Sequence, residues 1–291
     1  MTNKRSARKL LVLTSPAEMQ AWALVTRRKG KTIGFVPTMG ALHEGHLSLM
    51  RQARAENHAV VVSIFVNPMQ FGKGEDFDVY PKRLEGDKKG LRSVGVDVLF
   101  LPNNLNMYPD GFETTVKAGP LAKRWCGRSR PGHFDGVLTV VAKLFSLVQA
   151  DQAYFGEKDY QQYLLIKKMA ADLNMPTQVV GCPIYREPDG LAMSSRNYNL
   201  KKTNRKNAIS LSRVIEALQQ QVASGEKSVT KLKRYAHEQL ENIPRCEIDY
   251  IAIVDAATLV SIKKVERKAR VLLAVRFQQK PWVRLIDNGP L

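Results

Sequence analysis

The sequence predicts an α/β fold in which a Rossmann-like parallel sheet is followed by a smaller α+β domain, and three observations support this. Short apolar segments rich in β-branched residues alternate with helical patterns over the first 180 residues, which is typical of parallel strands joined by crossover helices. Polar motifs that contain Gly or Pro follow several of these segments, at the end of a parallel sheet where ligands bind. After residue 180 the pattern changes to two long helices and then three strands. We therefore predict a first domain over residues 1–180 and a second over residues 181–291.

Flanking Gly, Pro and Asn residues set the expected limits of each element in the first domain. The expected strands cover residues 32–36, 59–66, 96–101, 152–155 and 177–180. The expected helices between them cover residues 47–55, 83–93, 137–148 and 159–173. This order predicts helices on both faces of the sheet.

The second domain opens with an irregular polar stretch over residues 186–206, after Pro176 and Pro183 interrupt the regular pattern. Apolar residues at helical spacing then predict two helices, and β-branched segments predict three strands. The helices are expected over residues 208–223 and 229–241, and the strands over 248–254, 271–275 and 283–286.

The composition is that of an ordinary globular protein, with 44% hydrophobic and 25% charged residues. The apolar run over residues 10–13 is too short for a signal peptide, and no stretch reaches the length of a membrane span. We therefore expect a cytoplasmic protein. Cys126, Cys182 and Cys246 are widely spaced and form no Cys-x-x-Cys pair, which favours reduced thiols over a disulfide scaffold or a structural zinc site.

The formal net charge of +18 raises the possibility of nucleic-acid binding. Residues 181–291 contain 20 Lys and Arg against 11 Asp and Glu, so the basic excess is densest there. These basic residues have no interleaved aromatic residues and form no recognisable nucleic-acid module. The pattern favours a solvated basic surface, whose positive field attracts anionic substrates.

The most informative segment covers residues 36–50, where a strand ends, the chain turns at Pro37 and Gly40, and a helix starts. A helix start presents unpaired backbone N–H groups and a partial positive charge, which suits a phosphate group. His43 and His46 are three residues apart and so lie on one face of the first turn. Gly45 between them has no Cβ, which allows a flat ring to approach the backbone.

Two other interpretations of the histidines have to be considered. The helical zinc-protease motif needs histidines four residues apart, whereas His43 and His46 are three apart. A purely structural role, with both histidines capping the helix, remains open from this motif alone.

Residues 37–46 read Pro-Thr-Met-Gly-Ala-Leu-His-Glu-Gly-His. This segment resembles the His-x-Gly-His signature of the nucleotidyltransferase superfamily in the form found in the pantoate–β-alanine ligase family. Further segments that resemble that family follow in the expected order along nearly the whole chain: FVNPMQF at 65–71, SRPGHF at 129–134, FGEKDYQQ at 155–162, MSSRN at 193–197 and RLIDN at 284–288.

The resemblance implies an ATP-dependent condensation of pantoate with β-alanine to pantothenate, through a pantoyl adenylate, with release of AMP and pyrophosphate. It also implies a requirement for Mg²⁺, a homodimer, and a second domain that acts as a small lid. The small-molecule partners would be ATP, pantoate and β-alanine, with no nucleic acid and no membrane. The alternatives are another adenylate-forming nucleotidyltransferase of the same fold, since the histidine motif fits many substrates, or a basic nucleic-acid-binding protein.

The resemblance assigns the catalytic roles to residues that can donate hydrogen bonds or positive charge to phosphate oxygens, namely His46, His43, Lys158 and Arg196. It implies that ATP contacts Met39, Gly40, Ala41, Leu42, His43, Glu44, Gly45, His46, Gly156, Glu157, Lys158, Asp159, Ile184, Met193, Ser194, Ser195 and Arg196. It implies that pantoate contacts Pro37, Met39, Gln70 and Gln162.

Other interpretations of four of these segments remain open. Lys158 by position alone reads as a surface lysine, and Asp159 also suits the cap of the following helix. The serine-rich segment at 193–196 also reads as a turn with an exposed arginine. Asp87 is the candidate magnesium ligand, although Gly86 stands where some relatives carry a second carboxylate. Arg130 and His133, in a loop bent by Pro131 and Gly132, fit either the site rim or a dimer contact.

Overall fold

The computed structural model describes residues 9–72, 74–75, 77 and 80–291. The chain divides into two compact units. The first unit comprises residues up to Ala118, Arg130–Glu157 and Gln162–Pro183, and the second comprises Gly119–Ser129, Lys158–Gln161 and Ile184–Leu291. The change at Pro183 lies close to the boundary predicted at residue 180. The second unit also includes two short earlier segments, Gly119–Ser129 and Lys158–Gln161. A single boundary in the sequence does not separate the units in this way, so the boundary at residue 180 stays a prediction.

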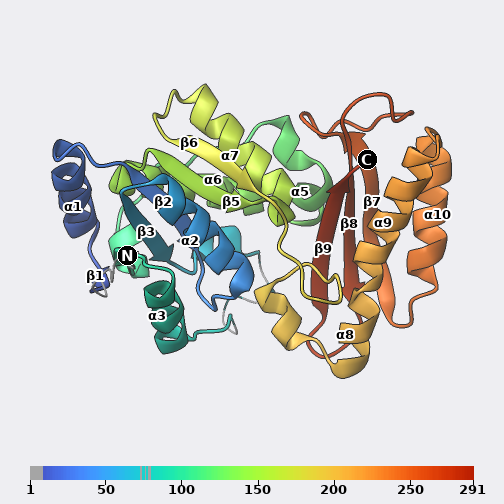
Figure 1. Ribbon diagram of the computed structural model, residues 1–291, viewed down its shortest axis with the longest axis horizontal. Coiled ribbons are helices and arrows are strands. Elements are labelled where there is room, and N and C mark those ends of the chain that lie inside the picture. The colour runs from blue at the N-terminus through green and yellow to red at the C-terminus, as the bar shows by residue number, and fades with distance from the viewer. Residues whose placement is uncertain (1–8, 73, 76, 78–79) are drawn as a thin grey trace, which may run out of the picture. The chain divides into compact units, whose positions relative to one another are not determined.

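The first unit is built on a six-stranded sheet in which all pairs are parallel (Figure 1). Its spatial order is β1 (Leu11–Leu13), β4 (Val98–Phe100), β3 (Ala59–Ile64), β2 (Ile33–Thr38), β5 (Gln152–Gly156) and β6 (Gln178–Cys182). Every residue of β3 is buried, as expected for a strand covered on both faces. The order reverses between β2 and β5, and ligands bind at such a switch point in open α/β sheets.

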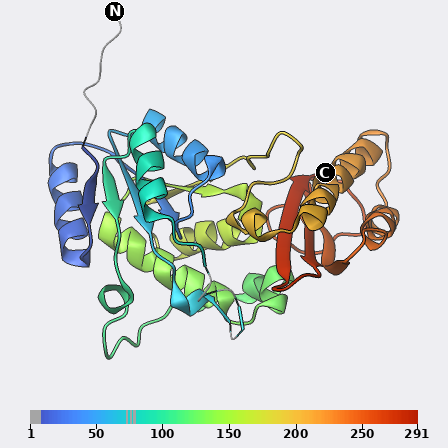
Figure 2. The same ribbon diagram turned by 90° about the horizontal axis from the view of Figure 1, so that it is seen from below.

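Helices cover both faces of this sheet, which confirms the predicted α/β class. Figure 2 shows α2 (Glu44–Glu56) and α3 (Leu84–Ser93) on one side of the sheet and α6 (His133–Val148) on the other. Helix α2 packs against β2, β3 and β5, and α6 packs against α1 (Pro16–Arg28). The remaining elements before residue 184 are α4 (Asn104–Met107), α5 (Trp125–Ser129), α7 (Tyr160–Asp172) and the 3₁₀ turns η1 (Pro68–Gln70), η2 (Pro120–Lys123) and η3 (Glu157–Asp159).

Helices α1 and α6 are among the elements that differ from the sequence-based expectation. Helix α1 was not expected, although Ser15 and Glu18 form a capping box around Pro16, with Glu18 N–H donating to Ser15 Oγ at 3.2 Å. Helix α6 begins at His133, one turn earlier than expected, because Gly132 adopts a left-handed φ of +80° and caps it. His133 therefore lies on a helix and not in the predicted loop.

The second unit contains an antiparallel sheet in the order β7 (Cys246–Asp255), β8 (Ala269–Phe277) and β9 (Val283–Pro290). Helices α9 (Ser210–Ala223) and α10 (Val229–Glu241) share one apolar core with this sheet. Each strand is longer than expected, because antiparallel pairing continues through charged residues such as Glu247 and Arg276. The stretch expected to be irregular contains the 3₁₀ turn η4 (Ser195–Asn199) and the short helix α8 (Lys202–Ala208).

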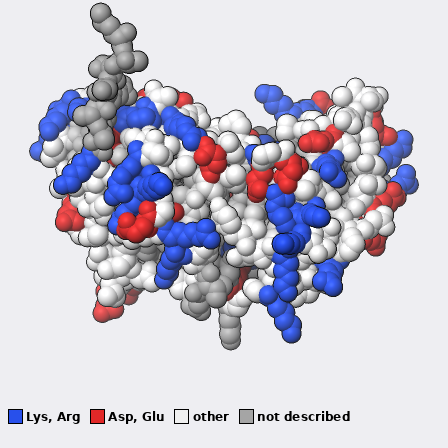
Figure 3. Space-filling view, turned by 60° about the horizontal axis from the view of Figure 1, so that its bottom comes forward, with Lys and Arg blue, Asp and Glu red and all other residues white. Residues whose placement is uncertain are grey.

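Three general features of the chain follow from the described residues. None of the helices that the structure describes combines the length and the apolarity needed to cross a bilayer. All three cysteines are free, and burial raises the pKa of the Cys182 thiol to about 12, which disfavours the reactive thiolate. On the face shown in Figure 3, Lys and Arg side chains are interspersed with acidic and uncharged residues, a mixture that keeps the surface solvated.

Candidate active site

Residues 38–46, which we call the histidine turn, connect β2 to α2 in the first unit. The Thr38 hydroxyl donates to the Ser63 carbonyl oxygen at 2.8 Å and accepts from the Gly40 N–H at 3.2 Å. Gly40 and Ala41 then adopt left-handed φ values of +84° and +49°. This conformation is freely accessible to glycine but costs about 1–2 kcal/mol for alanine. The turn therefore needs support from outside its own sequence.

Asp87 on α3 supplies that support. It is only 3% exposed, and its two oxygens accept hydrogen bonds from the Ala41 N–H at 3.0 Å and the Leu42 N–H at 2.8 Å. Burial raises the pKa of this carboxyl above its ordinary value, although the hydrogen bonds from Leu42 and Ala41 oppose the shift. The contact fixes the backbone just before the two histidines.

The two histidines lie at the start of α2. His43 is the N-cap, and its carbonyl oxygen accepts from the N–H groups of His46 at 2.9 Å and Leu47 at 3.1 Å. The imidazole rings lie with their centroids 4.0 Å apart. A long hydrogen bond of 3.4 Å runs from the His43 N–H to Nδ1 of His46. An accepting Nδ1 leaves the proton of a neutral imidazole on Nε2, so His46 can donate from Nε2.

Gln70, the last residue of η1, is held from both ends of its amide. It is 9% exposed, its Oε1 accepts from Asn67 Nδ2 at 3.1 Å, and its Nε2 donates to Met39 Sδ at 3.0 Å. Asn67 is in turn fixed by the Tyr108 hydroxyl, which donates to its Oδ1 at 2.8 Å. This network connects a residue of the histidine turn to Gln70.

The backbone of Gln70 is fixed by a second chain of contacts. The Gln70 carbonyl oxygen lies 2.7 Å from His133 Nδ1, so this nitrogen is the donor. Arg130 Nη1 lies 2.9 Å from His133 Nε2, which accepts. Glu75 binds the Arg130 guanidinium through both oxygens, at 2.7 Å and 2.5 Å. The structure thus gives Arg130 and His133 a place in the first unit, behind Gln70.

Helix α6 packs closely against η1, the turn that ends at Gln70. A Cβ on Gly136 of α6 would lie 2.1 Å from the Met69 carbonyl oxygen, which is far inside any tolerable contact. Only glycine permits α6 to lie directly against η1.

The other two residues expected to contact pantoate, Pro37 on β2 and Gln162 on α7, are half-buried.

The candidate nucleotide residues are divided between the two units. The first unit contains Met39, Gly40, Ala41, Leu42, His43, Glu44, Gly45, His46, Gly156 and Glu157. The second unit contains Lys158, Asp159, Ile184, Met193, Ser194, Ser195 and Arg196. Gly156 ends β5, which pairs with β2 in the sheet. The chain therefore leaves neighbouring strands at the histidine turn and at Glu157.

Residues 193–196, which we call the serine loop, lead into η4. Ser194 caps this turn by accepting the Arg196 N–H at 3.2 Å. Ser195 is 9% exposed, and Met193 and Arg196 are half-buried. The loop thus presents two hydroxyls and a guanidinium within one 3₁₀ turn, a donor set that suits an anionic ligand.

A hairpin over residues 185–193, which we call the supporting hairpin, precedes the serine loop. It is closed by the Met193 N–H, which donates to the Tyr185 carbonyl oxygen at 2.9 Å. Arg205 Nη2 pairs with Glu187 at 2.7 Å and with Asp189 at 2.8 Å. Burial lowers and these two carboxylates raise the pKa of Arg205, with a net increase. Ion pairs therefore connect the hairpin to α8.

Lys158 lies in η3 with 19% of its side chain exposed. Its Nζ is 3.8 Å from Asp159 Oδ2, and its carbonyl oxygen accepts from Asn288 Nδ2 at 2.8 Å. Lys158 is thus a partly buried cation whose backbone is anchored from the last strand. Ile184 is half-buried just before the supporting hairpin.

The described residues do not form a magnesium site built by the protein. Both oxygens of Asp87 already accept backbone hydrogen bonds, and Mg²⁺ demands nearly ideal octahedral oxygen geometry. Within the described part of the chain, no group of three or more His, Cys, Asp or Glu is arranged to hold a metal. Asp87 as a metal ligand stays a prediction that the hydrogen bonds do not favour.

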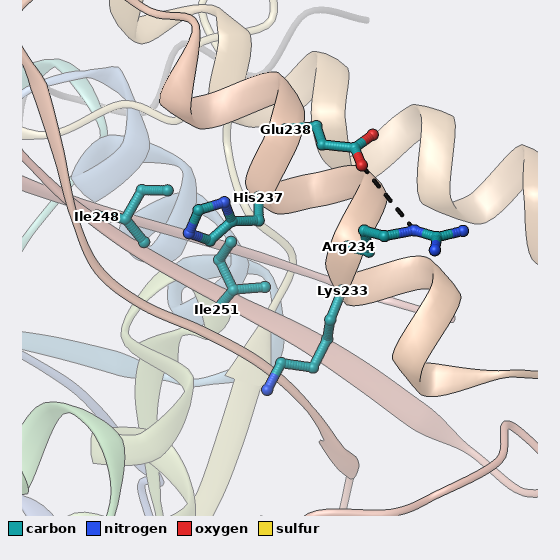
Figure 4. Close-up of a pocket in the computed structure, with 6 residues that line it drawn as sticks. All are labelled: Lys233, Arg234, His237, Glu238, Ile248 and Ile251. Carbon is teal, nitrogen blue, oxygen red and sulfur yellow. Dashed lines mark ion pairs between the residues drawn. The ribbon is translucent and has the colours of Figure 1, made fainter.

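A hollow of about 480 Å³ in the second unit contains none of the candidate residues (Figure 4). It lies between α10 and β7 and is lined by Lys233, Arg234, His237, Glu238, Ile248 and Ile251. Arg234 and Glu238 pair at 3.9 Å with 73% and 59% of their side chains exposed. Its charges are therefore solvated, and we place the chemistry elsewhere.

Sequence analysis did not identify the residues that support the site. No roles were assigned to Asn67, which binds Gln70, to Glu75, which binds Arg130, or to Asp287 and Asn288 on β9. Three of these residues, Asn67, Asp287 and Asn288, lie in segments that resemble family motifs. The signal available in the sequence was a polar residue inside an apolar strand or turn. Its partner could not be read from the sequence, because the contacts join residues far apart in the chain.

Comparisons with known proteins agree over nearly the whole chain. The family described as pantoate-beta-alanine ligase matches residues 11–290. A pantothenate synthetase of Thermotoga neapolitana is 49% identical over 280 residues, which cover 95% of this chain and 98% of the relative. One of Heliobacterium modesticaldum is 50% identical over 277 residues, with coverage of 95% and 98%.

Two solved structures are similar as well. The pantothenate synthetase of Thermus thermophilus has a TM-score of 0.91 and 48% identity, covering 96% of this chain and 99% of that one. The pantoate-beta-alanine ligase of Francisella tularensis, solved with beta-gamma ATP and beta-alanine, has a TM-score of 0.77 and 37% identity, with coverage of 97% and 98%.

Proposed function

The chain belongs to the pantoate-beta-alanine ligase family and is a ligase, and from this premise we propose that it joins pantoate to β-alanine in two steps. In the first step the pantoate carboxylate attacks the α-phosphorus of ATP, the bond to the β-phosphate oxygen breaks, and pyrophosphate leaves. In the second step the β-alanine amine attacks the carbonyl carbon of the pantoyl adenylate and AMP leaves. The observation that carries this proposal is the histidine turn, where a left-handed backbone leads to two histidines whose rings lie 4.0 Å apart at a helix start.

His46 is assigned to the α-phosphate. Charge grows on the non-bridging oxygens as the carboxylate attacks, and a fixed N–H donor stabilises that charge more than it stabilises the ground state. Because Nδ1 of His46 accepts from the His43 backbone, Nε2–H is the donor. The positive end of the α2 dipole acts in the same direction.

Lys158 and the serine loop are assigned to the phosphates and the departing pyrophosphate. Lys158 contributes a point charge, while Ser194, Ser195 and Arg196 contribute donors. Magnesium is expected to arrive with the polyphosphate, since Mg²⁺ in such sites is bound largely by phosphate oxygens and water. The homodimer and the cytoplasmic location stay predictions of the resemblance.

Pantoate is assigned to Gln70 and Gln162, with Pro37 and Met39 beside its gem-dimethyl carbon. Gln70 already uses one N–H and one oxygen lone pair internally, and an amide has a second of each for a hydroxyl or carboxylate. Since neither glutamine is charged, selection has to come from matched hydrogen bonds. An unpaired amide in a closed site costs about 1–3 kcal/mol.

The subsite is tested by Gln70→Ala in steady-state kinetics against each substrate. We expect KM for pantoate to rise about tenfold or more, KM for ATP to change little, and discrimination against 2-deoxy- and 4-deoxypantoate to fall. Gln161→Ala is an informative comparison, because the amide of Gln161 binds the Leu121 and Arg124 carbonyls and the Cys126 N–H. A raised KM for ATP with an unchanged KM for pantoate would move Gln70 to the nucleotide pocket.

The two-step mechanism is tested by isotope exchange. With pantoate, ATP and Mg²⁺ but no β-alanine, the protein should exchange labelled pyrophosphate into ATP, because the first step is complete and reversible by itself. Exchange that requires β-alanine would contradict the adenylate mechanism. Exchange supported by other carboxylic acids and not by pantoate would favour another adenylate-forming enzyme of this fold.

A further inference from the structure

The last strand carries two adjacent polar residues that are almost completely buried. On β9, Asp287 is 2% exposed and Asn288 is 3% exposed. Burying polar side chains is unfavourable unless they are hydrogen-bonded. Their partners therefore indicate why the strand retains them.

Asp287 binds the supporting hairpin. Its Oδ2 accepts from Arg186 Nη1 at 2.7 Å and its Oδ1 accepts from Arg186 Nη2 at 3.0 Å, a bidentate pair. Arg186 Nη1 also donates to the Gly190 carbonyl oxygen at 3.1 Å, across the turn of the hairpin. The side chain of Asp287 is 1% exposed, so this pair is little screened by salt. Asp287 thus fixes the segment that leads directly into the serine loop.

Asn288 binds the Lys158 backbone. Its Nδ2 donates to the Lys158 carbonyl oxygen at 2.8 Å. Successive side chains of a strand point to opposite faces, so Asp287 and Asn288 leave β9 on opposite sides. Two neighbouring residues therefore anchor two segments that are far apart in the sequence.

We propose that Asp287 and Asn288 are positioning residues of the ligase reaction. Asp287 sets the position of the serine loop through Arg186, and Asn288 sets the position of Lys158 through its carbonyl oxygen. The inference rests on the proposed function, because it requires that Lys158 and the serine loop bind the phosphates of ATP.

A double-mutant cycle tests the Asn288 contact. In the wild-type background, Asn288→Ala should lower the single-turnover rate of adenylation about tenfold, as expected when the charged group of Lys158 is displaced. In the Lys158→Ala background the same substitution should have less than a twofold effect, because the group that Asn288 positions is gone. Equal slowing in both backgrounds would show that Asn288 supports only general stability and would overturn its assignment.

Kinetic parameters test the Asp287 contact. Asp287→Asn keeps the shape but weakens the bidentate pair, and we expect KM for ATP to rise about fivefold while KM for pantoate changes less than twofold. Arg186→Lys removes the same fork from the more exposed side and should give the same split. It decides the question where Asp287→Asn yields too little folded protein. An unchanged KM for ATP in the folded variant would overturn the assignment.

Asp249→Asn is the matched control. Asp249 lies on β7 and accepts a hydrogen bond at 2.9 Å from Nε of Arg284, which lies on β9 like Asp287 and Asn288. It also accepts from the Ser129 hydroxyl at 2.9 Å. The printed partners of the Asp249 carboxylate, Ser129, Arg276 and Arg284, lie outside the supporting hairpin and are not Lys158. Asp249→Asn should therefore alter thermal stability without the ATP-specific change. Failure of the proposed function would be distinct: wild-type protein would then show no pantoate-dependent exchange, whatever the variants do.

Discussion

The histidine turn and the serine loop contain donors of similar kinds but are held in different ways. The histidine turn adopts a left-handed conformation at Gly40 and Ala41 and is fixed by backbone hydrogen bonds to the buried Asp87. The serine loop is fixed through ion pairs of the supporting hairpin, such as Arg205 with Glu187, whose side chains are 27% and 24% exposed. The strained histidine turn is held by hydrogen bonds to its own backbone, whereas the serine loop is held indirectly, through ion pairs of the supporting hairpin with the buried Asp287 and the partly exposed Arg205. The first region should therefore be rigid, and the second should respond to single changes by small shifts in ATP binding.

The comparison requires that the histidine turn carry chemistry, and Lys158, which lies outside both regions in η3, is tested in the same way. His46→Ala and Lys158→Ala should each slow adenylate formation about a hundredfold or more with the fold intact, because each removes a donor or charge used in the transition state. Rapid-quench measurement of adenylate and circular dichroism of the folded state check both points. His237→Ala is the matched control, since His237 lies on α10 with 56% of its side chain exposed. Near-normal adenylation by either variant would remove that residue from the catalytic set.

Asp87→Asn tests how the histidine turn is held. The amide replaces one of two accepting oxygens with a donor that faces a backbone N–H, so we expect kcat to fall about tenfold through displacement of His46. The Mg²⁺ concentration for half-maximal activity should stay the same. Glu85→Gln on the same helix is the control, because the Glu85 side chain is 82% exposed. A large increase in the Mg²⁺ requirement would instead support Asp87 as a metal ligand.

Glu75→Gln tests the ion pair of Glu75 with Arg130, which holds the Gln70 backbone through His133 and leaves 25% of the Glu75 side chain exposed. Burial opposes ionisation of Glu75, but the Arg130 guanidinium lowers its pKa below the ordinary value of 4.5. A lowered pKa in the folded state means that the stabilisation is complete above about pH 4.5 and is lost as the pH falls through the folded value. We expect wild type to exceed Glu75→Gln in unfolding free energy by up to about 1 kcal/mol at pH 7, with the difference shrinking below pH 4.5. Urea unfolding as a function of pH measures it, and a difference that grows on acidification would contradict this origin.

Arg205→Gln should give the smallest effect, on the serine loop. Loss of the pairs with Glu187 and Asp189 loosens the supporting hairpin, and we expect KM for ATP to rise about threefold, in line with the modest value of partly exposed ion pairs. KM for pantoate should not change. Arg234→Gln is the control, because its pair with Glu238 lies on α10 and is largely exposed. An effect as large as that of Asp87→Asn would show that the two regions are held alike.

Local patterns in the sequence predicted the elements on which both regions depend. The helix expected over residues 229–241 matches α10 at both ends, because Ser228 caps it and apolar residues recur at helical spacing. The parallel sheet followed from buried β-branched segments such as β3. Helix α1 carried an equally clear capping box that was not used.

The histidine turn shows where such prediction ends. The sequence placed a strand end, a glycine turn and a helix start around His43 and His46, because each of these is a local signal. It offered Asp87 only as a candidate magnesium ligand. Only the packing of α3 brings Asp87 to the Ala41 and Leu42 N–H groups.

The sequence by itself therefore determined the family, the order of the main elements, and which hydrogen-bond donors lie at the ends of those elements. What the tertiary structure decided is the partner of each buried polar side chain, as with Asp287 and Arg186 or Asn288 and Lys158. The physical reason is the range of the forces. Hydrophobic periodicity and capping act between neighbours in the chain, whereas a buried carboxylate or amide binds whichever donor or acceptor the complete fold brings within about 3 Å.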